Sequence, residues 1–420
     1  MTRRPAGPKP DRDPYGLGPI ATHVGPIAAA VVLIAIGAAT LGLMNGQIPF
    51  LKTSSNNTTG PPGPAITPAP PTVVLPEPAA FKGSIVYAKA GNIWIQTTDN
   101  VRQLTTSGND SMPSFSPDGK WVYFIRIQEG TGLYSLNGAR RAWYDLETPQ
   151  VSRVLVDGSA APEVLFSGRL RVGNSTWFSW IRQPVVSPDG KTIAVVSDAP
   201  ASGQSAVVLQ LYDIAKKKLT TPNLAQSSKL GHQDPAWRPD GQWILYVKNG
   251  RNGARGAPQI MRYVVATGKA APLTGPGYLA PAWSPDGRYI AATSTDNFGT
   301  DVVILDLKGS EILRVTDDAH SFSPVWSPTG DSIAFLHLAG QIVDLDLARL
   351  DGSSGNWTVK ETVPLTQVSG LDGASRPGWF VPASDLPPPT PVPSAATGGS
   401  APAGSAPAGS DGGSGGSTAP

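Results

Sequence analysis

The sequence predicts an all-β fold, a six-bladed β-propeller that is closed by strands from both ends of the domain and preceded by one transmembrane helix. Three observations lead to this prediction. A heptapeptide with proline at both ends recurs along the chain, and successive copies start 43 to 71 residues apart, the period expected of propeller blades rather than helical solenoids. The first sheet lacks an inner strand that the last copy supplies, and the N-terminal region holds a long uncharged segment.

The heptapeptide reads Pro-Ser-Phe-Ser-Pro-Asp-Gly where it first appears, and it predicts an edge strand followed by a tight turn. Proline lacks a backbone donor, so a segment with proline at both ends belongs at a sheet edge. Ser, Pro, Asp and Gly in this order suit a β-turn, with Gly free to take a positive φ. The copies lie at residues 113–119, 184–190, 235–241, 281–287 and 324–330, with a worn copy at 377–381.

A run of apolar residues follows each complete turn, for example residues 121–125 and 243–247. The apolar residues stand at consecutive rather than alternating positions, which predicts strands that are covered on both faces. A sheet packed between two neighbouring sheets meets that requirement.

The composition favours a folded domain with long extensions. The 420 residues include 47 Gly and 43 Pro, and the formal net charge is +2. No long basic run is present, which argues against a nucleic acid as partner. The chain has no cysteine, and this excludes disulfides, cysteine–zinc sites and thiol catalysis.

Residues 1–46 predict a membrane anchor. Residues 1–24 are rich in Pro and Gly and carry four basic side chains, so we expect a disordered cytoplasmic arm. Residues 25–46 are uncharged, and their apolar core from Ile27 to Met44 spans about 27 Å as a helix, close to the thickness of a bilayer core. The basic arm predicts that the N-terminus stays inside and the rest lies outside. A cleaved signal peptide is the alternative, but the apolar run is long for one and no small-x-small cleavage site closes it.

The sequence predicts two extensions around one globular domain. Residues 47–80 are rich in proline and predict a linker that holds the domain above the bilayer. Residues 386–420 consist largely of Pro, Ala, Gly, Ser and Thr, with Asp411 as the only charge, and predict a disordered tail. The propeller is therefore expected at residues 81–385.

The domain is predicted to close through its own ends. Residues 83–105 supply three strand-like segments without a proline-flanked strand before them, and residues 377–381 supply such a strand without a blade after it. Joined in space, they make one composite blade and bring the number of blades to six. Closure of this kind removes open sheet edges.

The repeated Pro-x-Trp-Ser-Pro-Asp-Gly, the strand after it and a closing Leu-Thr pair together resemble the TolB-like six-bladed β-propeller family, which is related to the WD-repeat propellers. The closing pairs are Leu104-Thr105, Leu219-Thr220, Leu273-Thr274, Val315-Thr316 and Leu365-Thr366. The resemblance implies a noncatalytic, partner-binding propeller outside the cytoplasm.

Two repeated columns are predicted to be structural. Trp237, Trp283, Trp326 and Trp379 occupy one position of the repeat, and repetition in register favours packing between blades over ligand stacking. The aspartates of the turns invite a metal interpretation, but each lies in a different blade and Thr329 breaks the series. Turn capping is the better account.

The loops that lead into the innermost strands converge on one mouth of the channel, and there the blades differ from one another. We therefore predict a ligand- or partner-binding site at this mouth, with a generic solvated rim as the alternative. The residues predicted to lie there are Asp110, Trp180, Arg182, His232, Asp234, Tyr278, Asp318, His320 and Arg376.

Blade two holds two inserts, around residues 130–141 and 168–182. The second insert carries Trp177, Phe178 and Trp180 outside the repeated column. Clustered aromatics of this kind indicate a contact surface, and a cap over the channel is the structural alternative.

The sequence predicts no catalytic residue, no cofactor and no metal. Only His232, His320 and His337 lie in the domain, and no Gly-x-Ser-x-Gly or His-Glu-x-x-His motif is present. A metal site from two of these histidines with Asp234 and Asp318 lacks a repeated spacing. We therefore predict a monomeric, membrane-anchored, noncatalytic module that binds other envelope proteins or cell-surface polymers. The alternative is an extracytoplasmic hydrolase or lyase that acts on a glycan or peptide at the channel mouth.

Overall fold

The computed structural model describes most of the globular domain. The described residues are 81–134, 142–172, 175–199, 207–224, 231–249, 258–296, 298–352 and 356–387. In this part of the chain no helix is long and apolar enough to cross a membrane. The predicted transmembrane helix at 25–46 lies outside the described residues, as do the basic arm, the linker and the tail from residue 388 onward.

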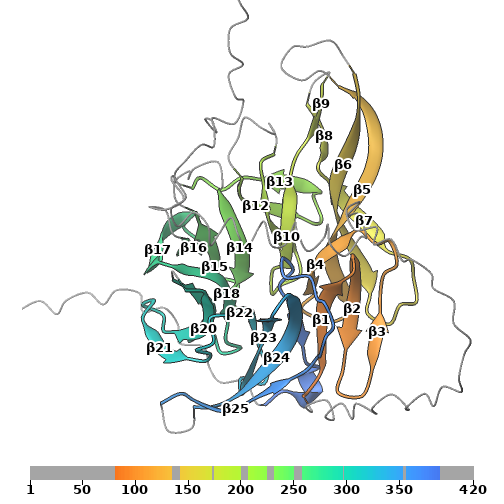
Figure 1. Cartoon of the computed structure of the whole chain (residues 1–420). Coiled ribbons are helices and arrows are strands. Elements are labelled where there is room, and N and C mark those ends of the chain that lie inside the picture. The colour runs from red at the N-terminus through yellow and green to blue at the C-terminus, as the bar shows by residue number, and fades with distance from the viewer. Residues whose placement is uncertain are drawn as a thin grey trace, which may run out of the picture.

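Six four-stranded antiparallel sheets surround a central channel and form a six-bladed propeller (Figure 1), which confirms the all-β fold predicted from the repeats. Listed from the innermost strand outward, the first three blades are β26 (Gly378–Phe380), β1 (Ser84–Lys89), β2 (Asn92–Gln96), β3 (Val101–Gln103); β4 (Asp110–Phe115), β5 (Trp121–Tyr134), β6 (Ala142–Leu155), β7 (Glu163–Ser167); and β10 (Ile181–Val186), β11 (Thr192–Ser197), β12 (Val208–Asp213), β13 (Lys218–Thr220).

The other three blades follow the same order. They are β14 (His232–Trp237), β15 (Trp243–Lys248), β16 (Gln259–Val264), β17 (Lys269–Pro276); β18 (Tyr278–Trp283), β19 (Ile290–Thr295), β20 (Thr300–Leu305), β21 (Glu311–Arg314); and β22 (Ser321–Trp326), β23 (Ser332–Ala339), β24 (Ile342–Asp351), β25 (Thr358–Pro364). A separate hairpin, β8 (Arg169–Val172) and β9 (Ser175–Phe178), stands between blades 2 and 3, and a 3-10 helix, η2 (Ala383–Asp385), follows β26.

The two ends of the domain meet in blade 1, as predicted. β26 pairs antiparallel with β1, and Trp379 lies opposite Ile85. The indole N–H of Trp379 donates to the carbonyl of Lys82 at 2.9 Å, and its ring packs edge-to-face on Phe81 with the centroids 5.7 Å apart. The last blade (blue in Figure 1) therefore lies beside the first strands (orange), and the ring is closed by residues from both ends.

The hydrophobic core lies between neighbouring blades. In β11, Ile193, Ala194 and Val195 have no exposed surface. Ile193 and Val195 pack against residues of blade 2, such as Tyr123, whereas Ala194 packs against residues of blade 4, such as Ile244. A strand with an apolar neighbour on both faces needs consecutive apolar residues, which is the pattern that the sequence shows.

In blades 4 and 5 the tryptophan column ties the innermost strand to the preceding blade. Trp237 donates its indole N–H to the carbonyl of Val185 at 3.1 Å, and Trp283 donates to the carbonyl of Ala236 at 3.2 Å. Trp283 and Trp326 are 8% and 4% exposed. These side chains fill the space between blades, as their repetition in register predicted, and each contributes about 1.5–3 kcal/mol through burial alone.

The Ser-Pro-Asp-Gly turns are held by hydrogen bonds within the turn itself. In blade 2 the hydroxyl of Ser116 donates to Asp118 Oδ1 at 2.6 Å and accepts the N–H of Trp121 at 2.9 Å. The corresponding serines and aspartates of blades 3 and 5 repeat both contacts. In blade 6, where Thr329 replaces the aspartate, its hydroxyl donates to Asp331 at 2.6 Å. The aspartate column therefore caps turns.

Five of the innermost strands bend at a β-bulge. The residue before the leading proline has a φ between 49° and 55°, although none of the five is glycine. These residues are Met112, Gln183, Asp234, Ala280 and Ser323. Side chains of the preceding blade hold this geometry: Asp234 Oδ2 accepts the N–H of Ala280 at 3.1 Å, and Thr293 Oγ1 accepts the N–H of Ser323 at 2.9 Å. A sparsely populated backbone conformation is thus fixed by contacts between blades.

Blade 2 carries a projecting arm. β5 and β6 have 14 residues each, against 6 in β11 and β12. The eight additional residues of each strand extend the hairpin by about 27 Å. The β8–β9 hairpin projects in the same direction (Figure 1), and the N–H of Gly168 joins its base to the carbonyl of Pro149 at 2.8 Å. We call residues 127–134 and 142–149, together with β8 and β9, the arm.

Candidate functional site

The two faces of the propeller are built from opposite ends of the innermost strands. One face carries the repeated Ser-Pro-Asp-Gly turns, and we call it the turn face. The other carries the loops that lead into the innermost strands, and we call it the mouth face. The arm extends from the mouth face, because the connection between the second and third strands of a blade lies at that end.

Three residues predicted for the mouth, Arg182, Asp234 and Arg376, come together at the central channel. Arg376 reaches across the channel from the loop before β26 and donates to the carbonyls of Pro281 at 2.7 Å and Pro235 at 3.1 Å. Burial lowers the pKa of both arginines, and the negative charge of Asp234 opposes this effect in each case. One guanidinium therefore joins the closing blade to blades 4 and 5.

The carboxylate of Asp234 is engaged by the channel wall rather than by an arginine. Its Oδ1 accepts the amide N–H of the Gln183 side chain, its Oδ2 accepts the backbone N–H of Ala280 at 3.1 Å, and its own backbone N–H donates to Gln183 Oε1 at 2.8 Å. Gln183 was not predicted as a site residue. Its position before the repeated proline was the available signal, since that is where the bulge turns a residue toward the channel.

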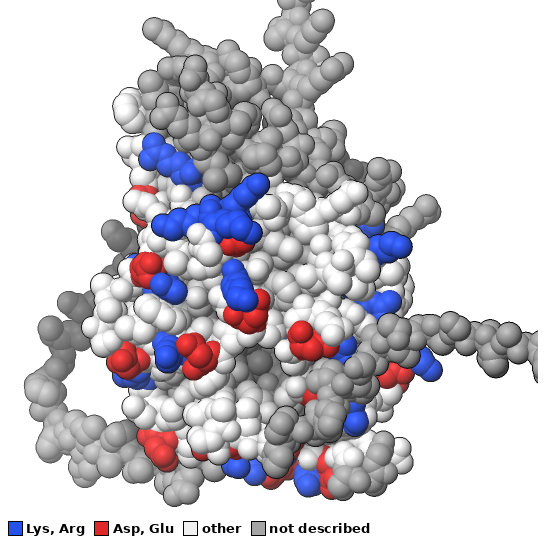
Figure 2. All heavy atoms as spheres, turned by 180° about the vertical axis from the view of Figure 1, so that it is seen from behind, with Lys and Arg blue, Asp and Glu red and all other residues white. Residues whose placement is uncertain are grey.

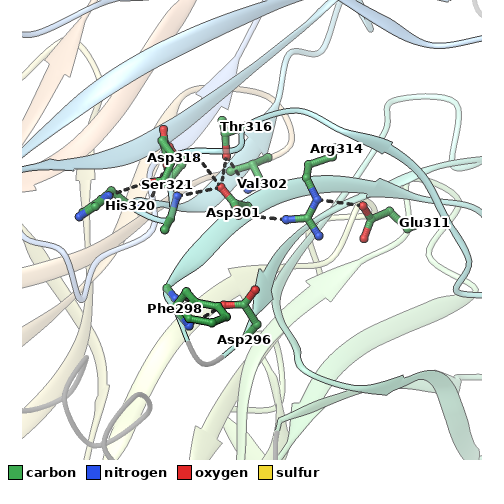
Figure 3. A network of polar contacts seen from close by, with 12 residues as sticks. Asp296, Phe298, Asp301, Val302, Glu311, Arg314, Thr316, Asp318, His320 and Ser321 are labelled. Atoms are coloured by element: carbon green, nitrogen blue, oxygen red, sulfur yellow. Dashed lines mark hydrogen bonds and ion pairs between the residues drawn. The ribbon is translucent and has the colours of Figure 1, made fainter.

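Asp318 and His320 lie together in the loop that enters blade 6 (Figure 3). Asp318 accepts the backbone N–H of His320 at 2.8 Å and the hydroxyl of Ser321 at 2.7 Å. Asp301 holds this loop in place, because it accepts the N–H of Asp318 at 2.9 Å while it forms an ion pair with Arg314 at 2.9 Å. The ring of His320 is exposed and points away from Asp301 (Figure 3).

His337 and Asp346 join Asp318 at the same edge of the mouth, and neither was predicted there. The His337 ring lies 3.1 Å from Asp346 and 3.9 Å from Asp318. Burial raises the pKa of Asp346, and His337 opposes that rise. Within the described ranges, no group of three or more His, Cys, Asp or Glu side chains is placed to hold a metal ion.

His232 is placed differently from the expectation. Its side chain is buried between blades 3 and 4 at 1% exposure, where Nδ1 accepts the N–H of Leu209 at 3.0 Å and the ring packs on Tyr246 with the centroids 4.5 Å apart. Burial lowers the pKa of His232 to about 4, so the ring is neutral at physiological pH. The residue begins an innermost strand, but its side chain turns toward the blades rather than the mouth.

Asp110 and Tyr278 are also engaged within the blades. Asp110 is buried and forms a two-pronged ion pair with Arg126, with both N–O distances at 2.7 Å. Tyr278 is half-buried, and burial, together with Glu311 beside it, raises the pKa of its hydroxyl. The predicted mouth residues therefore divide into a channel group, a loop group at blade 6 and residues that belong to the blades.

The predicted aromatic insert lies at the arm. Trp180 is 63% exposed, and its backbone N–H donates to Asp198 at 2.7 Å. Phe178 is partly buried at the end of β9, and Trp177 lies opposite Leu170 in the β8–β9 hairpin. The arm also presents Trp143, which is 70% exposed and was missed because the strand register of the first insert cannot be read from its residues.

Basic and acidic side chains alternate over the described surface in Figure 2. Several are joined in ion pairs, such as Arg153 with Glu163 at 2.8 Å and Arg288 with Asp286 at 3.0 Å. A nucleic-acid backbone requires a broad field of positive charge. The side of the molecule shown in Figure 2 offers no such field in its described part.

The fold and the repeated turns define a class of protein, the six-bladed propellers whose inner strands end in Ser-Pro-Asp-Gly. The model of the TolB β-propeller domain (PD40) matches residues 134–367, more than half of the chain. The chain therefore belongs to the TolB β-propeller family, and the resemblance seen in the repeats is confirmed.

Three comparisons show how distant the known relatives are. Uncharacterized protein Atu1656 of Agrobacterium fabrum is 29% identical over 145 residues, 34% of this chain and 40% of that protein, so the chain spans about two fifths of the curated relative it matches. TolB from Acinetobacter baumannii aligns with a TM-score of 0.50 at 19% identity, over 72% of this chain and 67% of that one. An oligogalacturonate lyase in complex with manganese aligns with a TM-score of 0.40 at 16% identity, over 62% and 83% of the two chains. The likeness to TolB, at 19% identity, shows the fold alone.

Proposed function

We propose that the chain is a noncatalytic binding module of the cell envelope, anchored in the membrane by residues 25–46, and that it captures a partner protein with its arm. The observation that carries this proposal is the hairpin of β5 and β6, whose strands have 14 residues each and extend far beyond the ring. Membership of the TolB β-propeller family supports a binding role.

The free edge of β5 is the feature best suited to a protein partner. β4 pairs with β5 only as far as Asp110 opposite Arg126, and the last contact is the N–H of Ile127 with the carbonyl of Asn109 at 2.9 Å. Beyond it, residues 128–134 have no strand on that side in the described part of the chain. An unpaired strand edge is a template on which another chain adds a strand.

Two exposed tryptophans of blade 2 and its inserts supply anchors for such a partner. Trp143 on β6 and Trp180 after β9 are 70% and 63% exposed. Large aromatic side chains often dominate the energetics of protein interfaces. A strand added to β5 with contacts to one or both tryptophans would combine backbone pairing with side-chain specificity.

The channel groups support binding without catalysis. Arg376 and Asp234 are engaged by backbone carbonyls and by the channel wall, and His232 is buried away from the mouth. A general base must reach the substrate proton that it abstracts. These three groups thus hold the propeller together.

Crosslinking in living cells tests the arm. A photoreactive amino acid at Thr131, exposed on β5, is expected to form an adduct with an envelope protein, whereas the same probe at Lys308, exposed on the turn face, is not. The adduct at position 131 should fall at least fivefold when Trp143 is changed to Ala, on the order expected for the loss of one interface anchor. Equal adducts at both positions, or adducts with surface polymers only, would contradict a protein partner.

Reporter fusions test the placement in the envelope. Alkaline phosphatase, which is active only outside the cytoplasm, is expected to be active when fused after residue 387 and inactive when fused after residue 13. The positive-inside rule gives this orientation, because basic residues precede the uncharged segment. Activity in neither fusion, or release of the chain by a salt wash, would overturn the anchor.

A further inference from the structure

The central channel contains a cavity of about 310 Å³ on the turn-face side of the bulges, lined by the innermost strands of all six blades. Its wall is largely apolar and includes Pro113, Phe115, Pro184, Trp237 and Trp283. This volume is at the lower end of the range for small-molecule sites. The cavity lies away from the arm, so nothing in the proposed partner binding uses it.

Arg376 is the one basic residue among those that line the cavity. Protein surrounds its guanidinium, which lowers its pKa, yet part of its surface stays accessible because it faces the cavity. A guanidinium carries five N–H donors, and the two contacts to Pro281 and Pro235 engage one each. Both contacts are to neutral carbonyls, and within the described chain no carboxylate lies within ion-pair distance of it.

Two other polar groups of the wall already have partners, whereas the buried indole N–H of Trp326 has none. The two oxygens of Asp234 accept from Gln183 and Ala280, and the hydroxyl of Ser114 donates to the carbonyl of Pro184 at 2.6 Å. The remaining donors of Arg376 therefore belong to a charged group that faces the cavity without a direct ion pair. Asp234 acts on Arg376 only through its charge, without a direct contact. An anion that pairs with the guanidinium would further offset the cost of burying it.

We propose that this cavity binds a carboxylate carried on an apolar body, with the carboxylate against Arg376 and the body among the prolines and tryptophans. Guanidinium and carboxylate match in shape, so the pair forms two parallel charge-assisted hydrogen bonds, which a neutral amide cannot do. The volume suits one aromatic ring on a short chain. Both a free organic acid and the C-terminus of a peptide that ends in an apolar residue carry this chemistry.

Calorimetry with the purified full-length chain tests the proposal with a matched pair of probes. 4-Phenylbutyrate is expected to bind at least tenfold more tightly than its amide, 4-phenylbutyramide, because only the acid pairs with the guanidinium. A short peptide that ends in Phe is compared with the same peptide carrying an amidated C-terminus. This pair tests a peptide C-terminus as the source of the carboxylate. Equal affinity for acid and amide, or no heat from either acid at millimolar concentration, overturns the proposal.

Two variants locate the site. Arg376→Gln is expected to reduce the affinity for the acid to that for the amide, whereas Arg288→Gln, an exposed arginine of the turn face, leaves both unchanged. Val325→Phe narrows the cavity without removing a contact of Arg376 and is expected to abolish the binding of both probes. Arg376 also joins three blades, so its replacement affects folding as well as binding. If Arg376→Gln does not fold, binding to Val325→Phe is the deciding measurement. Unchanged binding in Val325→Phe would place the ligand elsewhere and overturn the proposal.

Discussion

The turn face and the mouth face are built from the two ends of the same innermost strands, yet they are organised in opposite ways. On the turn face, blades 2, 3 and 5 repeat one serine–aspartate contact at 2.6 Å. On the mouth face the connections are less uniform. Asp301 and Asp344 hold the loops into blades 6 and 1 in the same way, but His232 is buried between blades 3 and 4, and Asp110 pairs with Arg126 in blade 2.

The difference follows from the range of the contacts. A turn is stabilised by groups two to five residues apart, so the same four residues give the same turn in every blade. The mouth contacts join groups that are distant in the sequence, as when Gln183 holds Asp234 or Arg376 reaches Pro281. Repetition therefore marks what builds the ring, and departures from repetition mark what distinguishes this propeller from others.

The largest expected effect tests the closure of the ring. Trp379→Ala removes a ring that is 9% exposed, its hydrogen bond to Lys82 and its contact with Phe81, and we expect it to lower the free energy of unfolding by about 3–5 kcal/mol. Urea unfolding followed by circular dichroism measures the loss. Phe298→Ala, at a residue that is 89% exposed on the mouth face, is the control and should change stability by less than about 0.5 kcal/mol. A loss below about 1 kcal/mol for Trp379→Ala would contradict closure through β26.

The second effect compares two histidines of the mouth region. The pKa of His232 falls from 6.5 to about 4 in the folded state, so the unfolded chain binds a proton more readily below pH 6.5. Its stabilising contribution is complete above pH 6.5 and is lost as the pH falls toward 4, in total about 3 kcal/mol.

Replacing His232 with Asn keeps an acceptor for the N–H of Leu209 but removes the titration. We expect the variant to lose less stability than the unsubstituted chain between pH 7 and pH 4, as measured by thermal unfolding over that range. His320→Asn is the matched control, because it removes a histidine that is exposed in the folded state. Identical pH profiles for His232→Asn and the unsubstituted chain would mean that His232 is accessible to protons in the folded state.

A smaller effect is expected from one turn. Asp286 accepts the hydroxyl of Ser284 at 2.6 Å and the N–H of Arg288 at 3.0 Å, so Asp286→Ala should cost about 0.5–1.5 kcal/mol. Asp286→Asn retains one acceptor and should cost less than half of that. The melting temperature of each variant gives the comparison. An increase in stability for Asp286→Ala would show that the carboxylate is present for a reason other than the turn.

The smallest stability effect is expected at the arm. Trp180→Ala should change the free energy of unfolding by less than about 0.5 kcal/mol, because the side chain is 63% exposed, while it weakens capture of the crosslinked partner at least fivefold. Unfolding and crosslinking yields measured on the same preparation separate the two effects. A stability loss above about 1 kcal/mol without a change in capture would indicate that the insert is a structural cap that covers the channel and not a contact surface.

The sequence was most informative where the contacts are local or repeated. The turns, the tryptophan column and the composite blade were predictable, because each depends on a short motif or on the count of its copies. The channel group was predicted only in part. Arg182, Asp234 and Arg376 were placed at the mouth by their position before the prolines, but Gln183 was not, and His232 was expected to face the mouth although it is buried.

Side-chain direction explains these differences. At a bulge the alternation of a strand is shifted, so position in the sequence does not tell which way a residue turns. Asp234 and Gln183 sit on bulges and face the channel, whereas His232 lies two residues earlier and packs against Tyr246. His337 and Asp346 approach Asp318 only because β23 and β24 pair beside the loop that enters blade 6.

The ring can be predicted from the repeats: the number of blades, the edge strands, the turns and the way in which the last strand completes the first sheet. These follow from backbone chemistry that acts within a few residues and from the spacing of repeats. Contacts between distant segments are needed to see that Arg376 crosses the channel above an apolar cavity and that β5 and β6 continue into an arm with a free edge. Both depend on which strands become neighbours, and closure of the ring is what brings those strands together.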